Sequence, residues 1–147
     1  MNNIVVPVDF SEQTESVLQI VTSVAKPLGA HIWLLHIAAP DPDFVGYGTG
    51  PDVVREQVAK GLREEHAKVQ ELGERLRGEG LEVTALAIQG PTVDTIIAEA
   101  NKLQADLIIL GSHGHGALFR TLMGSVSEGV LHRAPCPVLI VPPERED

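Results

Sequence analysis

The residues most suited to chemistry lie in one stretch, GSHGHGALFRTLMGS, from Gly111 to Ser125. Its glycines at 111, 114 and 124 have the spacing G-x2-G-x9-G-S, and the serine opens a helical pattern. Glycine lets a ligand approach the backbone closely. Free backbone N–H groups at a helix N-terminus bind phosphate oxygens. The stretch therefore predicts a phosphate-binding loop, to which the hydroxyls of Ser125 and Ser127 add hydrogen bonds.

The loop differs from the common phosphate motifs. It contains no lysine, so GxxxxGK[ST] is absent, and GxGxxG does not follow the first apolar run. Arg120 is the one formally charged side chain between Gly111 and Ser127, and it is the candidate cation beside the phosphates. The alternative interpretation is that the glycines only form turns.

The histidines favour phosphate over metal. His113 and His115 share the loop, but zinc takes three or four protein ligands, and Asp9 could join them only if the fold brings it close. We interpret both as loop residues near the phosphates. His36 lies inside an apolar run and is predicted to be a buried histidine with a partner. His66 lies in a charged segment and is predicted to be solvated.

The elements that position the loop are read from hydrophobic patterns. Nearly continuous apolar runs predict buried strands, and the run at 81–88 alternates as a strand nearer an edge does. Helical periodicity fills the intervals, with Ser11 as the expected N-cap of the first helix. The strands are predicted at 3–8, 31–38, 81–88, 105–110 and 136–141, and the helices at 12–26, 52–77, 92–103 and 125–133. This alternation predicts a parallel sheet with helices on both faces and a ligand at the carboxyl ends of its strands.

Composition narrows the class of protein further. The chain has 147 residues, which fits one domain, and 44% of them are hydrophobic. The formal charge of −9 argues against nucleic acid or anionic membrane as a partner. Cys136 is the single cysteine, so no internal disulfide forms. With no signal peptide or membrane span in the pattern, the expectation is a soluble cytoplasmic protein. The irregular segment 39–51 is interpreted as a mobile surface loop, with a lid or a partner-binding loop as the alternative.

Three segments together resemble the universal stress protein family in its ATP-binding branch. They are NIVVPVDFSE, LGSHGHG and FRTLMGSVSEGVLHRAPCPVLIV, and the resemblance covers essentially the whole chain, 1–147. It implies a Rossmann-like domain of the adenine nucleotide alpha hydrolase type, with a five-stranded parallel sheet in the order 3-2-1-4-5. It also implies ATP as ligand, accompanied by magnesium or manganese, and a homodimer formed through the last strand, Pro137–Val141.

The resemblance also implies roles for individual residues. Residues after the first strand would line the adenosine side, with the Asp9 carboxylate on a ribose hydroxyl or a metal ion. The end of the second strand would meet adenine through its backbone, and the glycine loop would hold ribose and phosphates. The implied ligand-binding residues are Pro7, Val8, Asp9, Ile37, Ala38, Leu110, Gly111, Gly114, Gly124, Ser125, Val126 and Ser127.

The function implied is that of an ATP-binding regulatory module in a stress response. No catalytic residue is predicted, because GxSxG is absent and Asp41 and Asp43 lie in a proline turn that usually exposes such acids. No base is placed to activate water for ATP hydrolysis, although slow hydrolysis stays open. Two alternatives remain: an ATP-hydrolysing or adenylyl-handling enzyme, and a nucleotide-free dimerisation or chaperone-like module.

Overall fold

The computed structural model describes residues 1–38, 51–112 and 123–143, and for residues 51–59 it describes the backbone only. Several expectations lie outside this part of the chain. They concern the segment 39–50 with Asp41 and Asp43, and the loop residues His113, Gly114, His115 and Arg120.

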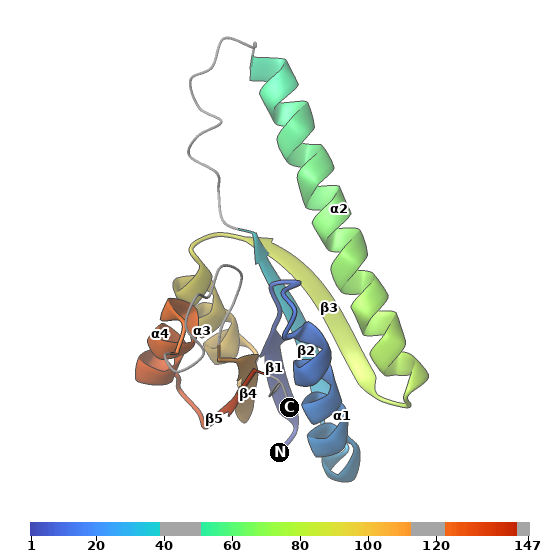
Figure 1. The fold of residues 1–147 in the computed structure, drawn as a ribbon, viewed down its shortest axis with the longest axis vertical. Helices are drawn as coiled ribbons and strands as arrows, with labels where there is room; N and C mark the ends of the chain where they lie inside the picture. Colours follow the sequence, from blue (N-terminus) through green and yellow to red (C-terminus); the bar gives the residue numbers. More distant parts are fainter. Residues whose placement is uncertain (39–50, 113–122, 144–147) are drawn as a thin grey trace.

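Strands and helices alternate along the chain (Figure 1). The order is β1 (Asn3–Pro7), α1 (Thr14–Leu28), β2 (His31–Ala38), α2 (Pro51–Gly78), β3 (Glu82–Gln89), α3 (Thr92–Lys102), β4 (Leu107–Gly111), α4 (Ser125–Arg133) and β5 (Val138–Val141). All nine predicted elements are therefore confirmed, with their ends displaced by a few residues at most.

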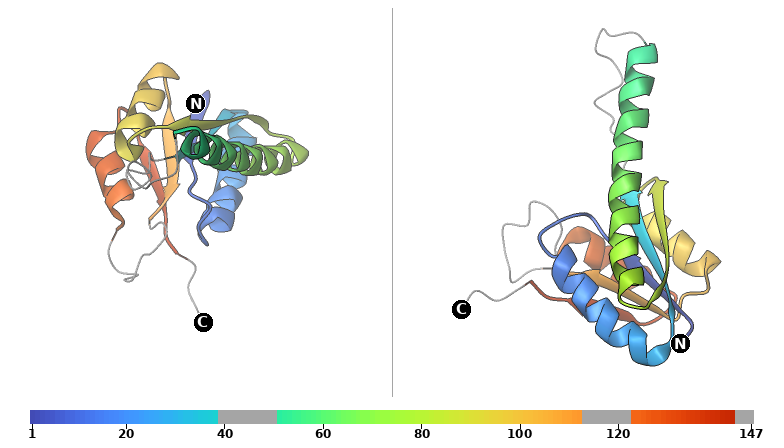
Figure 2. Two further views of the ribbon diagram at one scale, coloured as in Figure 1. Left: turned by 90° about the horizontal axis from the view of Figure 1, so that it is seen from above. Right: turned by 90° about the vertical axis from the view of Figure 1, so that its right-hand side faces the viewer.

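The strands form one parallel sheet in the order β3-β2-β1-β4-β5. This is the order implied by the resemblance, and β3, whose sequence alternates, lies at an edge as predicted. The chain moves outward from β1 to β3, then crosses to β4 and moves outward in the other direction. Because such crossovers are right-handed, α1 and α2 cover one face and α3 and α4 the other, as Figure 2 shows.

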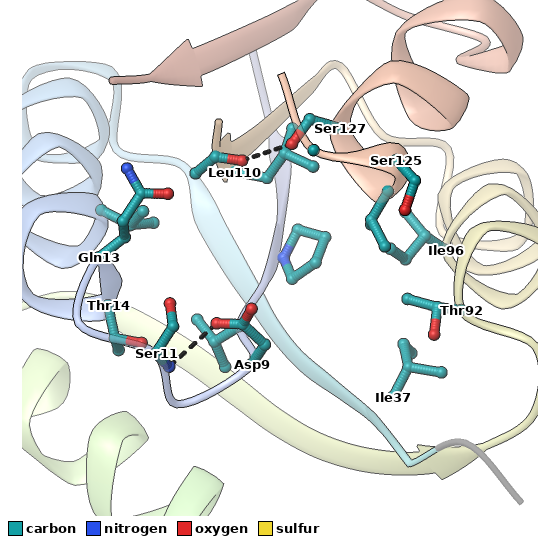
Figure 3. Close-up of a pocket in the computed structure, with 16 residues that line it drawn as sticks. Asp9, Ser11, Gln13, Thr14, Ile37, Thr92, Ile96, Leu110, Ser125 and Ser127 are labelled. Carbon is teal, nitrogen blue, oxygen red and sulfur yellow. Dashed lines mark hydrogen bonds between the residues drawn. The ribbon is translucent and has the colours of Figure 1, made fainter. Parts of the chain in front are cut away.

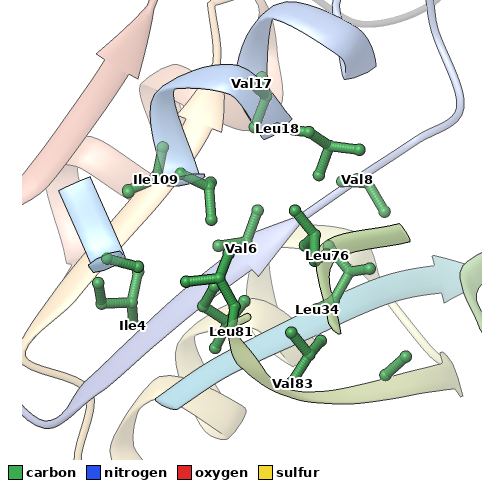
Figure 4. Close-up of a cluster of buried hydrophobic side chains, with 14 of the residues drawn as sticks. Ile4, Val6, Val8, Val17, Leu18, Leu34, Leu76, Leu81, Val83 and Ile109 are labelled. Carbon is green, nitrogen blue, oxygen red and sulfur yellow. The ribbon is translucent and has the colours of Figure 1, made fainter. Parts of the chain in front are cut away.

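Aliphatic side chains fill both layers. On the face of α1 and α2, Ile4 and Val6 of β1 pack with Leu34 and Ile109 against Val17 and Leu18 of α1 (Figure 4). On the other face, alternate residues of the same strands pack against Ile96, Ala100 and Val130. Each interior strand is thus apolar on both sides, which explains the continuous hydrophobic runs.

The start of α1 differs from the expectation. Ser11 is not the N-cap, because the helix begins at Thr14 and Gln13 occupies the cap position without a capping side-chain hydrogen bond. The reason is a turn before the helix, in which Phe10 has a φ of 59° and the Ser11 N–H donates to Asp9 Oδ1 at 3.0 Å. The Asp9 side chain thus stabilises a turn at the position where Ser11 was expected to begin the helix.

The expectation for His66 is confirmed, since it is exposed on α2, and that for His36 is confirmed in part. His36 is buried and its Nδ1 lies 3.0 Å from the Val8 carbonyl oxygen, but its buried Nε2 has no hydrogen-bond partner among the described residues. Among the described residues, no helix is long and apolar enough to cross a membrane.

Candidate functional site

The sheet opens where its winding direction reverses. β1 and β4 are paired at Ile4 with Leu107 and at Val5 with Ile108, near their amino ends. Further along, β1 stays paired with β2 as far as Pro7 and Leu35, and β4 stays paired with β5 as far as Gly111. The space between the carboxyl ends of β1 and β4 is the switch point at which open α/β sheets bind ligands.

A cavity of about 420 Å³ occupies this switch point (Figure 3). Its volume lies within the range of small-molecule sites. One wall is formed by the end of β1 and the start of α1, and the opposite wall by β4, α3 and α4. The lining residues are Pro7, Val8, Asp9, Ser11, Gln13, Thr14, Val17, Ile37, Thr92, Ile96, Leu110, Gly111, Gly124, Ser125, Val126 and Ser127.

Ten of the twelve expected ligand-binding residues line this cavity. Gly114 lies outside the described residues. Ala38 is described but does not line the cavity, because β2 continues to pair with β3 as far as Ala38 and Gln89, and the Ala38 carbonyl accepts the Gly90 N–H at 3.0 Å.

The N-terminus of α4 forms the polar end of the second wall. Gly124 is the N-cap, in an extended conformation, and its own N–H donates to the Ser112 carbonyl at 2.7 Å. The first intrahelical bond runs from the Glu128 N–H to the Gly124 carbonyl, at 3.0 Å. The N–H groups of residues 125–127 precede that bond and have no acceptor within the helix. They can therefore bind an anion that enters the cavity.

Ser127 supports this wall with its side chain. The buried Ser127 Oγ lies 2.7 Å from the Gly111 carbonyl oxygen and 2.9 Å from that of Ser112. A hydroxyl has one proton, and here it is donated to carbonyls at the end of β4. The expected hydrogen bond from this hydroxyl to phosphate is therefore not available in this arrangement. The exposed side chain of Ser125 has no such constraint.

Gly111 allows close packing across the mouth of the cavity. A Cβ atom at this position would lie 2.8 Å from Gln13 Oε1, so the Gln13 side chain rests directly over the glycine backbone. Gln13 thus joins α1 to the end of β4.

Six lining residues were missed by the sequence interpretation. Ser11, Gln13, Thr14 and Thr92 lie at or just before helix starts, and Val17 and Ile96 lie about one turn into their helices. The alternation of strands and helices in the sequence could have indicated these residues. In a parallel sheet every helix that follows a strand begins at the carboxyl edge, beside the ligand.

The local charge pattern suits an anion although the chain is acidic overall. The first residues of α1, α3 and α4 (Thr14, Thr92 and Ser125) all line the cavity, so three helix N-termini present partial positive charge to it. Each first turn also contains an acid, and the one on α3, Asp94, is paired with Arg133 at 2.6 Å. Asp9 brings a carboxylate to the opposite wall. Among the described residues, no group of three or more metal-ligating side chains gathers.

A doubly wound parallel α/β domain with an anion-compatible cavity at its switch point is a nucleotide-binding type of architecture. The chain belongs to the universal stress protein family, whose model matches residues 1–142. Universal stress protein MJ0531 of Methanocaldococcus jannaschii is 30% identical over 140 residues, which are 94% of this chain and 80% of that protein.

Solved structures agree with the fold. The structure of MJ0577, also from Methanocaldococcus jannaschii, superposes with a TM-score of 0.86 at 28% identity and covers 99% of this chain and 98% of its own. A universal stress protein of Archaeoglobus fulgidus in complex with dAMP has a TM-score of 0.64 at 24% identity, covering 96% of this chain and 98% of that one. At that identity the second likeness shows the fold alone.

Proposed function

We propose that this chain is an ATP-binding universal stress protein that acts as a regulatory module in a stress response in the cytoplasm. The observation that carries the proposal is the cavity between β1 and β4, with a helix N-terminus on one wall and Asp9 on the other. Such a pair of walls matches a ligand that has an anionic end and a hydroxyl-bearing ring.

The residues have distinct parts in this proposal. The backbone N–H groups of residues 125–127, the Ser125 hydroxyl and the backbone at Gly111 and Gly114 would hold the phosphates. The Asp9 carboxylate would accept a hydrogen bond from a ribose hydroxyl. Apolar lining from Ile37, Leu110 and Val126 would contact the base and sugar. dAMP, an adenine nucleotide, is the ligand of the Archaeoglobus protein of the same fold.

A magnesium or manganese ion fits this site only as a companion of the triphosphate. Both ions prefer oxygen ligands, and magnesium is commonly held by one or two carboxylates together with substrate phosphates. Asp9 is the described carboxylate that lines the cavity and could join them. The ion would neutralise phosphate charge, while the protein would supply the orientation of the nucleotide through its backbone N–H groups.

Calorimetric titration of nucleotide-stripped protein with Mg-ATP tests the proposal. The parent should bind saturably, and Asp9→Asn should bind more weakly at an unchanged melting temperature. Glu82→Gln is the matched control, because Glu82 is exposed at the amino end of β3, on the edge opposite the cavity. Titration with ADP, AMP and GTP then ranks the nucleotides. Absence of saturable binding by the parent would contradict the proposal.

The homodimer belongs to the same proposal. β5 is an edge strand, and its residues Val138, Leu139 and Ile140 are only partly buried. An apolar edge of this kind exposes unpaired backbone groups that a second copy can cover. We therefore propose that Pro137–Val141 forms the dimer contact. Sedimentation velocity of the parent should give the mass of a dimer at micromolar concentration, and a monomer at every concentration tested would contradict it.

A further inference from the structure

His36 lies behind the ligand cavity, on the face of the sheet covered by α2. Its side chain follows Ile32 and Leu34 on that face and is 10% exposed. It does not line the cavity itself. Its contacts nevertheless reach the segment that contains Asp9, the carboxylate of the proposed nucleotide site.

Two contacts connect His36 to this segment. His36 Nδ1 lies 3.0 Å from the Val8 carbonyl oxygen, and because a carbonyl only accepts, Nδ1 is the protonated donor. The imidazole also stacks on the Phe10 ring, with centroids 4.3 Å apart and an interplanar angle of 30°. His36 therefore holds the residue before Asp9 and the residue after it.

The conformation of Phe10 shows why this support matters. Its φ of 59° is left-handed, which is unfavourable for a bulky side chain. Such a conformation persists only when surrounding contacts hold it. The stack on His36 is one such contact, so the turn that orients Asp9 depends on a ring lying on the far side of β1 from the ligand.

The opposite edge of the imidazole faces α2. His36 Nε2 lies 3.5 Å from Glu65 Oε2, at ion-pair distance but without hydrogen-bond geometry. The contact is attractive when the ring carries both protons. One helical turn later, Lys68 Nζ lies 5.6 Å from the centroid of the Phe10 ring. Within the described part of the chain, the charged side chains that contact the His36–Phe10 stack are thus Glu65 and Lys68, both on α2.

We propose that His36 is a positioning residue that couples helix α2 to the nucleotide-binding turn, so that occupation of the site changes the dynamics of α2. This rests on the proposed nucleotide function and adds a route by which the bound state is transmitted. The route is a continuous chain of contacts from Asp9, through Val8 and Phe10 to His36, and on to Glu65. The α2 ribbon extends beyond the sheet in Figure 1.

Four variants separate the parts of this route. His36→Leu removes both ring nitrogens. His36→Asn keeps an amide donor near the position of Nδ1 but removes the ring and Nε2. Glu65→Gln removes only the charge of the carboxylate that faces His36 Nε2. His66→Asn is the matched control, because His66 is the neighbouring exposed histidine on α2.

Two measurements are made on each folded variant: the affinity for Mg-ATP by calorimetry, and hydrogen exchange of residues 60–78 with and without nucleotide. His36→Leu should bind about tenfold more weakly, since a supporting hydrogen bond is lost. His36→Asn should recover only the part of that affinity that the hydrogen bond to Val8 carries, because the stack on Phe10 is still absent. In the parent and in His66→Asn, nucleotide should slow exchange in α2, and in Glu65→Gln and His36→Asn this protection should disappear.

The outcomes are distinguishable. Equal affinity in His36→Leu and the parent, or unchanged nucleotide protection of α2 in Glu65→Gln, would overturn the coupling while leaving nucleotide binding in place. A parent that binds no nucleotide would overturn both proposals.

Discussion

The two serines at the start of α4 should respond to substitution in opposite ways. Ser127→Ala removes a buried hydroxyl that lies 2.7 Å from the Gly111 carbonyl oxygen and 2.9 Å from that of Ser112. The Ser112 carbonyl keeps the Gly124 N–H at 2.7 Å, whereas the Gly111 carbonyl loses this donor. One poorly satisfied, partly buried carbonyl costs about 1–2 kcal/mol of folding free energy. For a domain of this size that corresponds to a fall in Tm of roughly 2–8 °C.

Ser125→Ala is the matched comparison at the same helix end. Its side chain is exposed, so the change in the free energy of unfolding should stay within about 0.5 kcal/mol. The affinity for Mg-ATP should fall about fivefold to tenfold, because a charge-assisted hydrogen bond to phosphate is lost. Thermal and urea unfolding measure the stability of each variant, and calorimetry measures its affinity.

An exchange of effects between the two variants would contradict the roles assigned to the two hydroxyls. A Ser127→Ala protein that melts within a degree of the parent would show that its hydroxyl does not support β4. A Ser125→Ala protein that binds Mg-ATP as tightly as the parent would remove its hydroxyl from the phosphate site.

Three further predictions concern stability. Hydrogen bonds from the backbone N–H groups of Asn3 and Asn2 lower the pKa of the Asp106 carboxyl group. At pH values above the ordinary pKa of an aspartate, the ionised carboxylate therefore stabilises the fold. This stabilisation is lost as the pH falls through the lowered pKa of the folded state. Asp106→Asn should therefore lower Tm at pH 7, and its difference from the parent should shrink below about pH 4; a constant difference would count against this. In α2, Gly61→Ala should stabilise by up to about 1 kcal/mol in urea unfolding. Gly73→Ala should gain less, because its Cβ would lie 3.1 Å from the Cβ of Ala85 on β3, whereas a Cβ at Gly61 meets no described atom within 4 Å; equal gains in stability would contradict this. Thr14→Val should leave Tm unchanged or raise it, because the buried Thr14 hydroxyl has no hydrogen-bond partner among the residues that the structure describes, and a clear fall in Tm would contradict this.

The fold could be predicted because hydrophobic periodicity reports burial directly. The runs at 3–8 and 31–38 are apolar on both sides because helices cover both faces of their strands. The run at 81–88 alternates because β3 lies at the edge, where Glu82 and Gln89 are exposed. The hydrophobic pattern of a strand depends on whether helices cover one or both of its faces. That coverage follows from the alternation of strands and helices along the chain.

The details of the site could not be predicted in the same way, because they depend on backbone geometry. Nothing in the pattern around Ser11 indicates that Phe10 adopts a left-handed conformation and delays the helix to Thr14. The type and spacing of Ser127 suit a phosphate contact, but the direction of its hydroxyl is set by the nearby end of β4. The residue types were enough to predict where the site lies, whereas the roles of single hydroxyl groups could be assigned only from the three-dimensional structure.

The pairing between β1 and β4 has a mechanical consequence. Two residue pairs, together with the Asp106 carboxylate on the N–H groups of Asn2 and Asn3, join the two halves of the sheet at its amino edge. The carboxyl edge of the same seam is the cavity, with one wall from each half. A tensile load applied between β3 and β5 would therefore concentrate along this seam. A molecule bound to both walls would carry part of that load, so the force needed to part the sheet would rise with occupancy.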